Sequence, residues 1–291
     1  MRSRTVLALG AVLATAVAAA HVLAQEYTEA WRLTGFTQPE SASYDPGTGT
    51  LFVSNISSPD FSPNGMGYIT QLSLDGEVIT ERFVDGLNTP AGTFVSDGTL
   101  WVVAGGLAEI DIATGAVRNT FTSPDLAFPN DVFVAEDGRV FVTDTFGSAI
   151  FVLENGELTL WLRDPQLAGA NGITVIGDTV YVARVGDVSG GFENMVPNGN
   201  IKTIDLATRA IGDFGSPDPI GGLDGIEPMD QGLMVTDHPG GRLLQVAPDG
   251  TVTELAMPGA GAADHEFIPD EHLVIIPMLN TGEVIAYRTR M

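Results

Sequence analysis

The sequence repeats one pattern six times, and this repetition restricts the possible folds more than any other feature. Each copy has a short apolar strand, a turn rich in Asp and Gly, and a second strand rich in Val, Phe, Leu, Trp or Tyr. The copies occupy residues 39–54, 90–103, 129–142, 170–183, 223–236 and 263–276. Self-similarity of this kind indicates a repeat architecture, in which every copy is one supersecondary unit.

Each copy continues into a third strand, and the first five also have a fourth. The sixth copy lacks a fourth strand, whereas residues 28–36 (TEAWRLTGF) have the fourth-strand pattern. An N-terminal strand that completes the last sheet would close a ring and remove two exposed edges. We therefore predict an all-β fold, a six-bladed β-propeller of four-stranded blades with the last blade closed by the N-terminal strand. The exchanged strand argues against the alternative, an open β-solenoid.

Residues 1–24 are predicted to be a signal peptide, which leaves 25–291 as a single propeller domain. Arg2 and Arg4 precede an apolar stretch, residues 6–20, that is followed by small residues suited to cleavage. The stretch is shorter than the ~20 residues of a spanning helix, which disfavours an uncleaved membrane anchor. We expect a periplasmic or secreted protein with no membrane span in its mature form.

The composition excludes several classes of site. The chain has no cysteine, so disulfides and thiolate-based zinc or redox sites are absent. Its net charge of −24 repels phosphate backbones and attracts cations, so we expect no nucleic-acid partner. The sequence contains no G-x-S-x-G motif, no H-E-x-x-H motif and no Gly-rich phosphate-binding loop.

One residue stands at the start of the first strand of each copy, and in a propeller this strand lines the central channel. Aligning the copies assigns this ring position to Glu40, Ala91, Asn130, Asn171, Asp224 and Asp264. Five of the six carry a side-chain oxygen where a core would favour Val or Ile. Buried carboxylates and amides need partners, and converging carboxylates repel one another.

A hard divalent cation would resolve this repulsion, because calcium accepts about 6–8 oxygen ligands from carboxylates, amides and water. Glu40 and Asp224 supply two negative charges, and Asn130 and Asn171 supply neutral oxygens. We expect these four residues to hold a divalent metal cofactor, Ca²⁺ first, with Mg²⁺, Mn²⁺ or Zn²⁺ as alternatives. Capping of free backbone N–H groups would explain a single Asn or Asp better, but five equivalent positions favour a metal.

The segments after each second strand are predicted to surround this metal, because the start of strand one and the end of strand two share one end of a blade. Two of these segments are long, residues 55–67 and 184–200. Loops of this length are often functional, and here they would wall a pocket. Asp144, Arg184 and His238 also fall at this rim, although each alone is better explained as a solvated loop residue.

The pattern resembles the gluconolactonase/regucalcin (senescence marker protein) family, with paraoxonase and diisopropylfluorophosphatase as more distant relatives. The resemblance covers about residues 36–288 and is carried by PESASYDPGTGTLFVSN, FPNDVFVAEDGRVFVTDT, ANGITV and LDGIE. It implies a six-bladed propeller with a divalent metal, usually calcium, in the channel. The family's ligands are a Glu in blade one, Asn in blades three and four, and Asp in blade five. They fall on Glu40, Asn130, Asn171 and Asp224.

The sequence departs from these relatives in two places. Sugar-lactone hydrolases of this kind tend to place an Arg two residues before the blade-three Asn, where this chain has Phe128. Paraoxonases use a histidine pair, whereas the mature chain has only His238, His265 and His272. His265, beside Asp264, is expected to approach the channel, and His272 is expected to be structural. The resemblance therefore predicts the family more strongly than it predicts the substrate.

The resemblance implies a hydrolase acting on a small neutral lactone or other ester, with the metal polarising the carbonyl. We expect the protein to be a monomer. It favours Asp224 as the reactive carboxylate, with Asp131 as an alternative base or an orienting residue. A non-catalytic exported propeller that binds a ligand or protein around a structural metal is the main alternative, because fold alone does not decide function. A metal-free propeller resembling strictosidine synthase is disfavoured by Glu40 and the two Asn residues.

Overall fold

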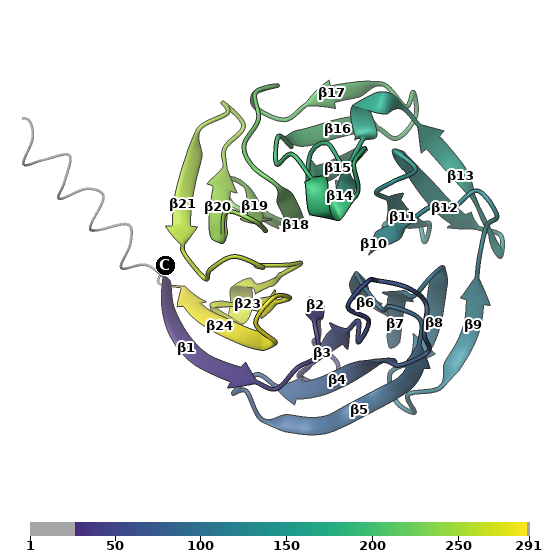
Figure 1. Cartoon of the computed structure of the whole chain (residues 1–291), viewed down its shortest axis with the longest axis vertical. Helices are drawn as coiled ribbons and strands as arrows, with labels where there is room; N and C mark the ends of the chain where they lie inside the picture. Colours follow the sequence, from purple (N-terminus) through teal and green to yellow (C-terminus); the bar gives the residue numbers. More distant parts are fainter. Residues whose placement is uncertain (1–26, 290–291) are drawn as a thin grey trace, which may run out of the picture.

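The structure is a computed structural model that describes residues 27–289, so the predicted signal peptide lies outside the described residues. Six four-stranded antiparallel sheets stand radially around a central channel (Figure 1). This arrangement confirms the predicted six-bladed β-propeller. Within the described range, none of the helices has the length and apolar character needed to cross a membrane.

In the first five blades the strands follow one another from the channel outward in sequence order. Blades one and two contain β2 (Pro39–Asp45), β3 (Thr50–Asn55), β4 (Gly67–Ser73) and β5 (Val78–Leu87), then β6 (Thr93–Ser96), β7 (Thr99–Val103), β8 (Leu107–Asp111) and β9 (Val117–Phe121). Blades three and four contain β10 (Pro129–Val134), β11 (Val140–Asp144), β12 (Ala149–Glu154) and β13 (Glu157–Arg163), then β14 (Ala170–Ile176), β15 (Thr179–Arg184), β16 (Ile201–Asp205) and β17 (Ile211–Asp213). Blade five contains β18 (Leu223–Met229), β19 (Gly232–Asp237), β20 (Arg242–Val246) and β21 (Val252–Ala256).

The last blade joins the two ends of the described chain. It contains β22 (Glu266–Ile268), β23 (Leu273–Met278) and β24 (Glu283–Thr289), and β1 (Tyr27–Thr34) is its outermost strand. β1 pairs with β24 in antiparallel register from Tyr27↔Thr289 to Thr34↔Glu283, and the two strands lie side by side in Figure 1. Trp31 packs into the core shared by blades six and one and donates its indole N–H to the Leu74 carbonyl at 2.8 Å. The predicted closure by the N-terminal strand is therefore confirmed.

The hydrophobic core lies between neighbouring blades rather than at the centre of the ring. Phe141 and Trp161 of blade three, for example, meet at 5.3 Å between ring centroids and share one apolar cluster with Ile173 and Val182 of blade four. Side chains that alternate along each strand fill these spaces. The apolar packing fixes the inner strands and leaves their channel-facing positions free for polar residues.

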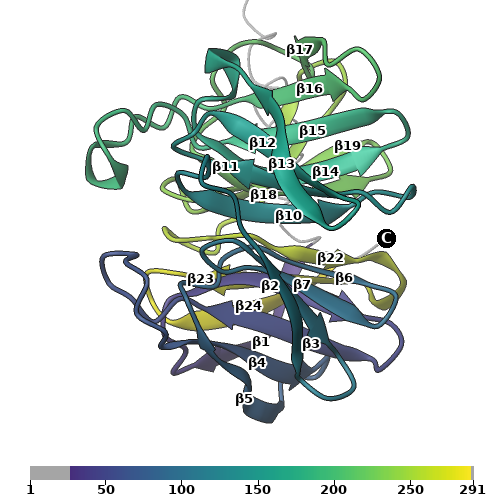
Figure 2. The same cartoon turned by 90° about the vertical axis from the view of Figure 1, so that its right-hand side faces the viewer.

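The two predicted long loops are residues 56–66, between β3 and β4, and residues 185–200, between β15 and β16. The second contains a short 3₁₀ helix, η2 (Phe192–Asn194); the others are η1 (Pro165–Leu167) and η3 (Pro269–Glu271). Both loops project from the same side of the propeller disc (Figure 2). Blades one and four lie opposite each other in the ring (Figure 1), so the two loops approach from opposite sides of the channel.

Candidate metal centre

The four predicted ligands lie at the inner edge of the ring, each at an irregularity of its first strand. The pairing of the first and second strands shifts register next to Glu40, Asn130, Asn171 and Asp224, which is the pattern of a β-bulge. Bulges bend a strand and redirect a side chain, and they occur frequently beside active sites. In blades two and six the regular first strand begins only after the ring position, at Thr93 and Glu266.

Hydroxyl groups on the second strands stabilise three of these bulges. The backbone N–H groups of Ser41, Asp131 and Gly225 donate to the side chains of Ser54, Thr143 and Thr236 at 2.9–3.0 Å. The Thr143 hydroxyl then donates to the backbone carbonyl of Asn171 (2.7 Å), and the Thr236 hydroxyl donates to the backbone carbonyl of Ala263 (2.9 Å). Each of these two threonines therefore links its own bulge to the next blade.

One buried oxygen of each predicted ligand has no hydrogen-bond partner among the described residues. These atoms are Glu40 Oε2, Asn130 Oδ1, Asn171 Oδ1 and Asp224 Oδ1. The four residues are only 4–6% exposed, and all of them line one cavity of about 580 Å³. Buried polar atoms normally have partners, so four unsatisfied oxygens in one cavity form a donor set that an electropositive ligand would fit.

The donor chemistry fits an oxygen-preferring dication. Two carboxylates and two amide oxygens match the ligands that calcium takes in proteins and leave coordination positions for water and substrate. Within residues 27–289, no group of three or more His, Cys, Asp or Glu side chains has the arrangement of a metal site. A metal here would therefore depend on the amides of Asn130 and Asn171 as well as on Glu40 and Asp224.

The pKa of Glu40 shows how a cation would act on this candidate site. Burial raises the pKa of Glu40 well above its usual range, and the charges of Asp224 and Asp131 raise it further. A carboxyl in this environment is costly to ionise unless an opposite charge stands beside it. A dication would remove that cost, because it attracts the ionised form of both carboxylates.

Asp224 has an ionisable neighbour of opposite type in close contact. Its Oδ2 atom lies 3.1 Å from Nδ1 of His238, which follows β19 and also lines the cavity. Burial alone would lower the pKa of His238, but the contact with the Asp224 carboxylate outweighs it and raises the pKa. The structure therefore places an acid–base pair at the cavity floor.

Asp131 lies beside the set but faces protein rather than the cavity. Its Oδ1 accepts the N–H of Val132 at 2.7 Å, and its Oδ2 accepts the N–H of Ile173 in blade four at 2.8 Å. Burial raises its pKa to about 7, although these backbone hydrogen bonds favour the carboxylate. Asp131 is not among the residues that line the cavity, so the geometry favours Asp224 over Asp131 as the reactive group.

Asp264 and His265 are also buried next to the channel but do not line the cavity. Asp264 accepts the Ser41 hydroxyl at 2.7 Å, and burial raises its pKa well above the usual range. His265 is 1% exposed, and burial lowers its pKa to about 3. Both pack against Gly225, where an added Cβ would lie 2.5 Å from Asp264 Oδ1 and 2.7 Å from His265 Nδ1. The glycine permits this close approach of blades five and six.

Asp144 and Arg184 make hydrogen bonds that hold the segments at the rim of the cavity in place. Asp144 is fully buried and accepts the backbone N–H groups of Ala127 and Phe128, both at 2.7 Å. Arg184 donates to the Ala168 carbonyl and to Asn200 Oδ1, both at 2.9 Å, and so joins the two ends of the 185–200 loop. Neither residue lines the cavity, whereas His238 does.

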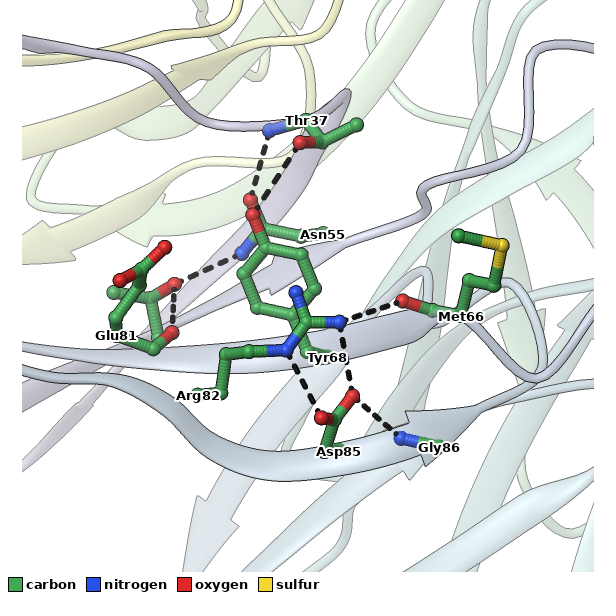
Figure 3. A network of polar contacts seen from close by, with 9 residues as sticks. Thr37, Asn55, Met66, Tyr68, Glu81, Arg82, Asp85 and Gly86 are labelled. Carbon is green, nitrogen blue, oxygen red and sulfur yellow. Dashed lines mark hydrogen bonds and ion pairs between the residues drawn. The ribbon is translucent and has the colours of Figure 1, made fainter.

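The 56–66 loop is anchored at both ends by a polar network (Figure 3). Arg82 on β5 donates to both carboxylate oxygens of Asp85 at 3.0 Å and to the Met66 carbonyl at 3.2 Å. At the other end of the loop, Asn55 Oδ1 accepts the N–H of Thr37 at 3.2 Å. These contacts hold the loop against blade one, so its tip has a defined position over the cavity.

An aromatic wall above the four oxygens was not predicted from the sequence. We define this wall as Phe61, Phe128 and Phe192, which all line the cavity, with Phe146 packed behind the last two. The three cavity-lining rings come from the 56–66 loop, the segment before β10 and η2. They are separated by more than 60 residues in sequence, so no local pattern connects them. The sequence signals were the length of the two loops and the presence of Phe128 where sugar-lactone hydrolases tend to have Arg.

The fold and the site define a class, a six-bladed β-propeller with an oxygen-lined cavity at one mouth of its channel. No family model matches the sequence, and no curated protein matches it. A gluconolactonase from Xanthomonas campestris is similar in structure, with a TM-score of 0.68 and 18% identity over 92% of this chain and 92% of that chain. Virginiamycin B lyase from Staphylococcus aureus has a TM-score of 0.61 and 16% identity over 91% of this chain and 100% of that chain.

A chain from a nidogen/laminin complex also shares the architecture, with a TM-score of 0.60 and 15% identity over 83% of this chain and 94% of that chain. At these identities the likeness shows the fold alone. Gluconolactonases are among the proteins that share it, as the sequence resemblance predicted. Because proteins of such different kinds share the fold, the function has to be argued from the site.

Proposed function

We propose that this protein is a metal-dependent hydrolase of a lactone or another carboxylic ester. The observation that carries the proposal is the set of four unpartnered buried oxygens from Glu40, Asn130, Asn171 and Asp224 in one cavity. When bound, a dication such as Ca²⁺ would polarise the substrate carbonyl and stabilise the oxyanion that forms. The opening of about 580 Å³ above the oxygens is large enough for a small ester.

The chain's own acid–base pair would move the protons. In this proposal Asp224 accepts a proton from the attacking water, while His238 delivers a proton from Nδ1 to the leaving oxygen. The 3.1 Å contact between Asp224 Oδ2 and His238 Nδ1 then lets the proton pass from the carboxyl to the imidazole, which restores both groups. Asn130 and Asn171 remain neutral throughout and orient the site.

Hydrolysis should be assayed with a panel of lactones, aryl esters and phosphotriesters, with and without chelator. We expect metal-dependent turnover, and we expect Asp224→Asn to lower kcat/KM by about 10²- to 10⁴-fold while the far-UV circular dichroism stays unchanged. Glu193→Gln is a matched control, because Glu193 is an exposed carboxylate that lines the same cavity. It should retain activity.

Two results would contradict the proposal. Turnover that is insensitive to chelator would remove the metal from the reaction, and full activity of Asp224→Asn would remove Asp224. A third outcome, melting that depends on the metal without turnover of any substrate, would support the alternative of a non-catalytic propeller with a structural metal.

A further inference from the structure

The aromatic wall gives the cavity a character that the four oxygens alone do not explain. Its rings pack closely, with centroids 5.2 Å apart for Phe128–Phe192, 5.8 Å for Phe61–Phe192 and 6.3 Å for Phe61–Phe128. The arrangements are tilted or edge-to-face, which aromatic rings prefer. Phe61 and Phe192 belong to loops of opposite blades, so the wall spans the mouth of the channel.

The backbone holds Phe61 in an unfavourable conformation to complete this wall. Its φ of 58° lies in the left-handed region, which bulky residues rarely adopt. The N–H of Phe61 donates to the Ser58 carbonyl at 3.0 Å, and the hydroxyls of Ser58 and Ser62 both donate to Asp60 Oδ1. Strain that the surroundings maintain in this way points to a functional constraint on the ring.

Phe128 is fixed by contacts with residues of blade three. Its N–H donates to the buried Asp144 carboxylate at 2.7 Å, and its ring lies 5.1 Å from that of Phe146. Phe61, Phe128 and Phe192 are only partly buried although each of them contacts other rings, so each keeps an exposed surface next to the cavity they line. The wall is therefore a preorganised apolar surface that faces the cavity, rather than part of the hydrophobic core.

The remainder of the cavity lining is compatible with an uncharged ligand. The other apolar side chains that line it include Ile56, Leu126, Val185, Met195 and Leu279. Among the described residues that line the cavity, none is Lys or Arg. Away from the four oxygens and His238, a ligand group that enters the cavity therefore meets mainly apolar and aromatic side chains.

We propose that the substrate is an aromatic ester or a benzo-fused lactone, whose ring packs against the aromatic wall while its carbonyl faces the four oxygens, where a dication that they hold would polarise it. This inference rests on the proposed hydrolase function. In the reaction, water forms the new bond to the carbonyl carbon, the acyl C–O bond breaks, and the departing oxygen takes a proton. The products are a carboxylic acid and a phenol or alcohol. The aromatic ring of the substrate would pack against the wall in the same tilted or edge-to-face geometry that the three phenylalanine rings adopt with one another.

The test compares dihydrocoumarin with δ-valerolactone, which has the same six-membered lactone ring without the fused benzene. Phe61→Ala and Phe192→Ala should lower kcat/KM for dihydrocoumarin about 3- to 10-fold, as expected for the loss of one aromatic contact, and change that for δ-valerolactone less than 2-fold. Phe214→Ala is the matched control, because Phe214 is a partly buried ring on blade four that does not line the cavity. It should change neither value.

An equal loss for both lactones, or no loss for either, would overturn the assignment of the wall to an aromatic substrate while leaving the hydrolase proposal in place. If the wild-type protein hydrolyses neither lactone, calorimetry with 3,4-dihydroquinolin-2-one, the corresponding lactam, separates the two proposals. Binding that Phe61→Ala and Phe192→Ala both weaken would keep the aromatic recognition and reject hydrolysis of these lactones. Absence of binding would reject the aromatic assignment, and the wider ester panel would still decide the hydrolase proposal.

Discussion

Glu40→Gln should change the stability of the protein in opposite directions, depending on whether a divalent metal is present. Glu40 is 6% exposed, its Oε2 has no partner among the described residues, and the charge of Asp224 acts on it. Without metal, an ionised Glu40 is a buried charge that lacks compensation, which destabilises the folded state. The neutral Gln removes this cost, so the metal-free variant should melt above the metal-free wild type at pH 8.

With metal, the order should reverse, and the size of the metal effect can be worked out. A ligand at 100 times its dissociation constant stabilises the folded state by about 2.7 kcal/mol. The described domain has about 260 residues, and the entropy of unfolding near 60 °C is about 2.1 cal/mol/K per residue, or about 0.55 kcal/mol/K in total. Saturating Ca²⁺ should therefore raise the Tm of the wild type by about 5 °C.

The assay is differential scanning calorimetry of chelator-treated protein at pH 8, titrated with Ca²⁺. Glu40→Gln should retain less than about 1 °C of the metal-induced increase, because one of the two carboxylates is lost, whereas Glu193→Gln on the exposed rim should retain all of it. A Glu40→Gln variant that loses apo stability and keeps the full Ca²⁺ response would refute the assignment of Glu40 as a ligand. A wild type without any response to Ca²⁺, Mg²⁺, Mn²⁺ or Zn²⁺ would refute the metal site itself.

Three further predictions concern the scaffold. Thr143→Val preserves shape but leaves the Asp131 N–H and the Asn171 carbonyl without their partner, so it should cost about 1–3 kcal/mol and lower Tm by about 2–5 °C, whereas Thr143→Ser should restore most of the loss. Trp31→Ala should destabilise the closing strand by about 3 kcal/mol in a urea melt, because it removes both the packing of the indole and its bond to Leu74; an unchanged midpoint would show that β1 does not contribute to closure. Burial raises the pKa of Glu266 to about 8, although its bond from the Tyr44 N–H favours the carboxylate. The folded state therefore binds a proton that the unfolded state has released, and stability should fall as pH rises from about 4.5 to about 8. Glu266→Gln should flatten that part of the pH profile of Tm, and an unchanged slope would contradict it.

The fold could be predicted almost completely from the sequence because every blade repeats the same local pattern. Alternation of apolar residues gives the strands, and Asp–Gly turns give their ends, so the four strands of each blade are visible in the sequence. The closure by β1 was predictable for the same reason, because residues 28–36 have the pattern that is missing from the sixth copy. The short β22 was less visible, because pairing in blade six becomes regular only at Glu266.

The candidate site was only partly predictable. The ring position could be found by alignment because it is a fixed point of the repeat, and the structure brings Glu40, Asn130, Asn171 and Asp224 to one cavity. The aromatic wall could not be found this way, because its rings lie in irregular loops whose tips are positioned by tertiary contacts such as those of Arg82. The hydroxyl contacts to the bulges could not be predicted either. The sequence shows only a Ser or Thr near the end of a second strand, and β propensity alone would explain such a residue there.

The buried channel carboxylates show which property distinguishes a candidate ligand from a structural polar residue. Burial does not separate them, because Asp131 and Asp264 are as inaccessible as Glu40 and Asp224. Hydrogen bonding does: both oxygens of Asp131 accept backbone N–H groups, and Asp264 accepts the hydroxyl of Ser41. A carboxylate that accepts a donor from a neighbouring blade, as Asp131 does from Ile173, joins the two blades, whereas an oxygen that the fold buries without any donor remains a candidate ligand for a group from outside the chain. Five ring positions with side-chain oxygens are thereby reduced to four, and Asp264 is assigned to the contact between blades one and six.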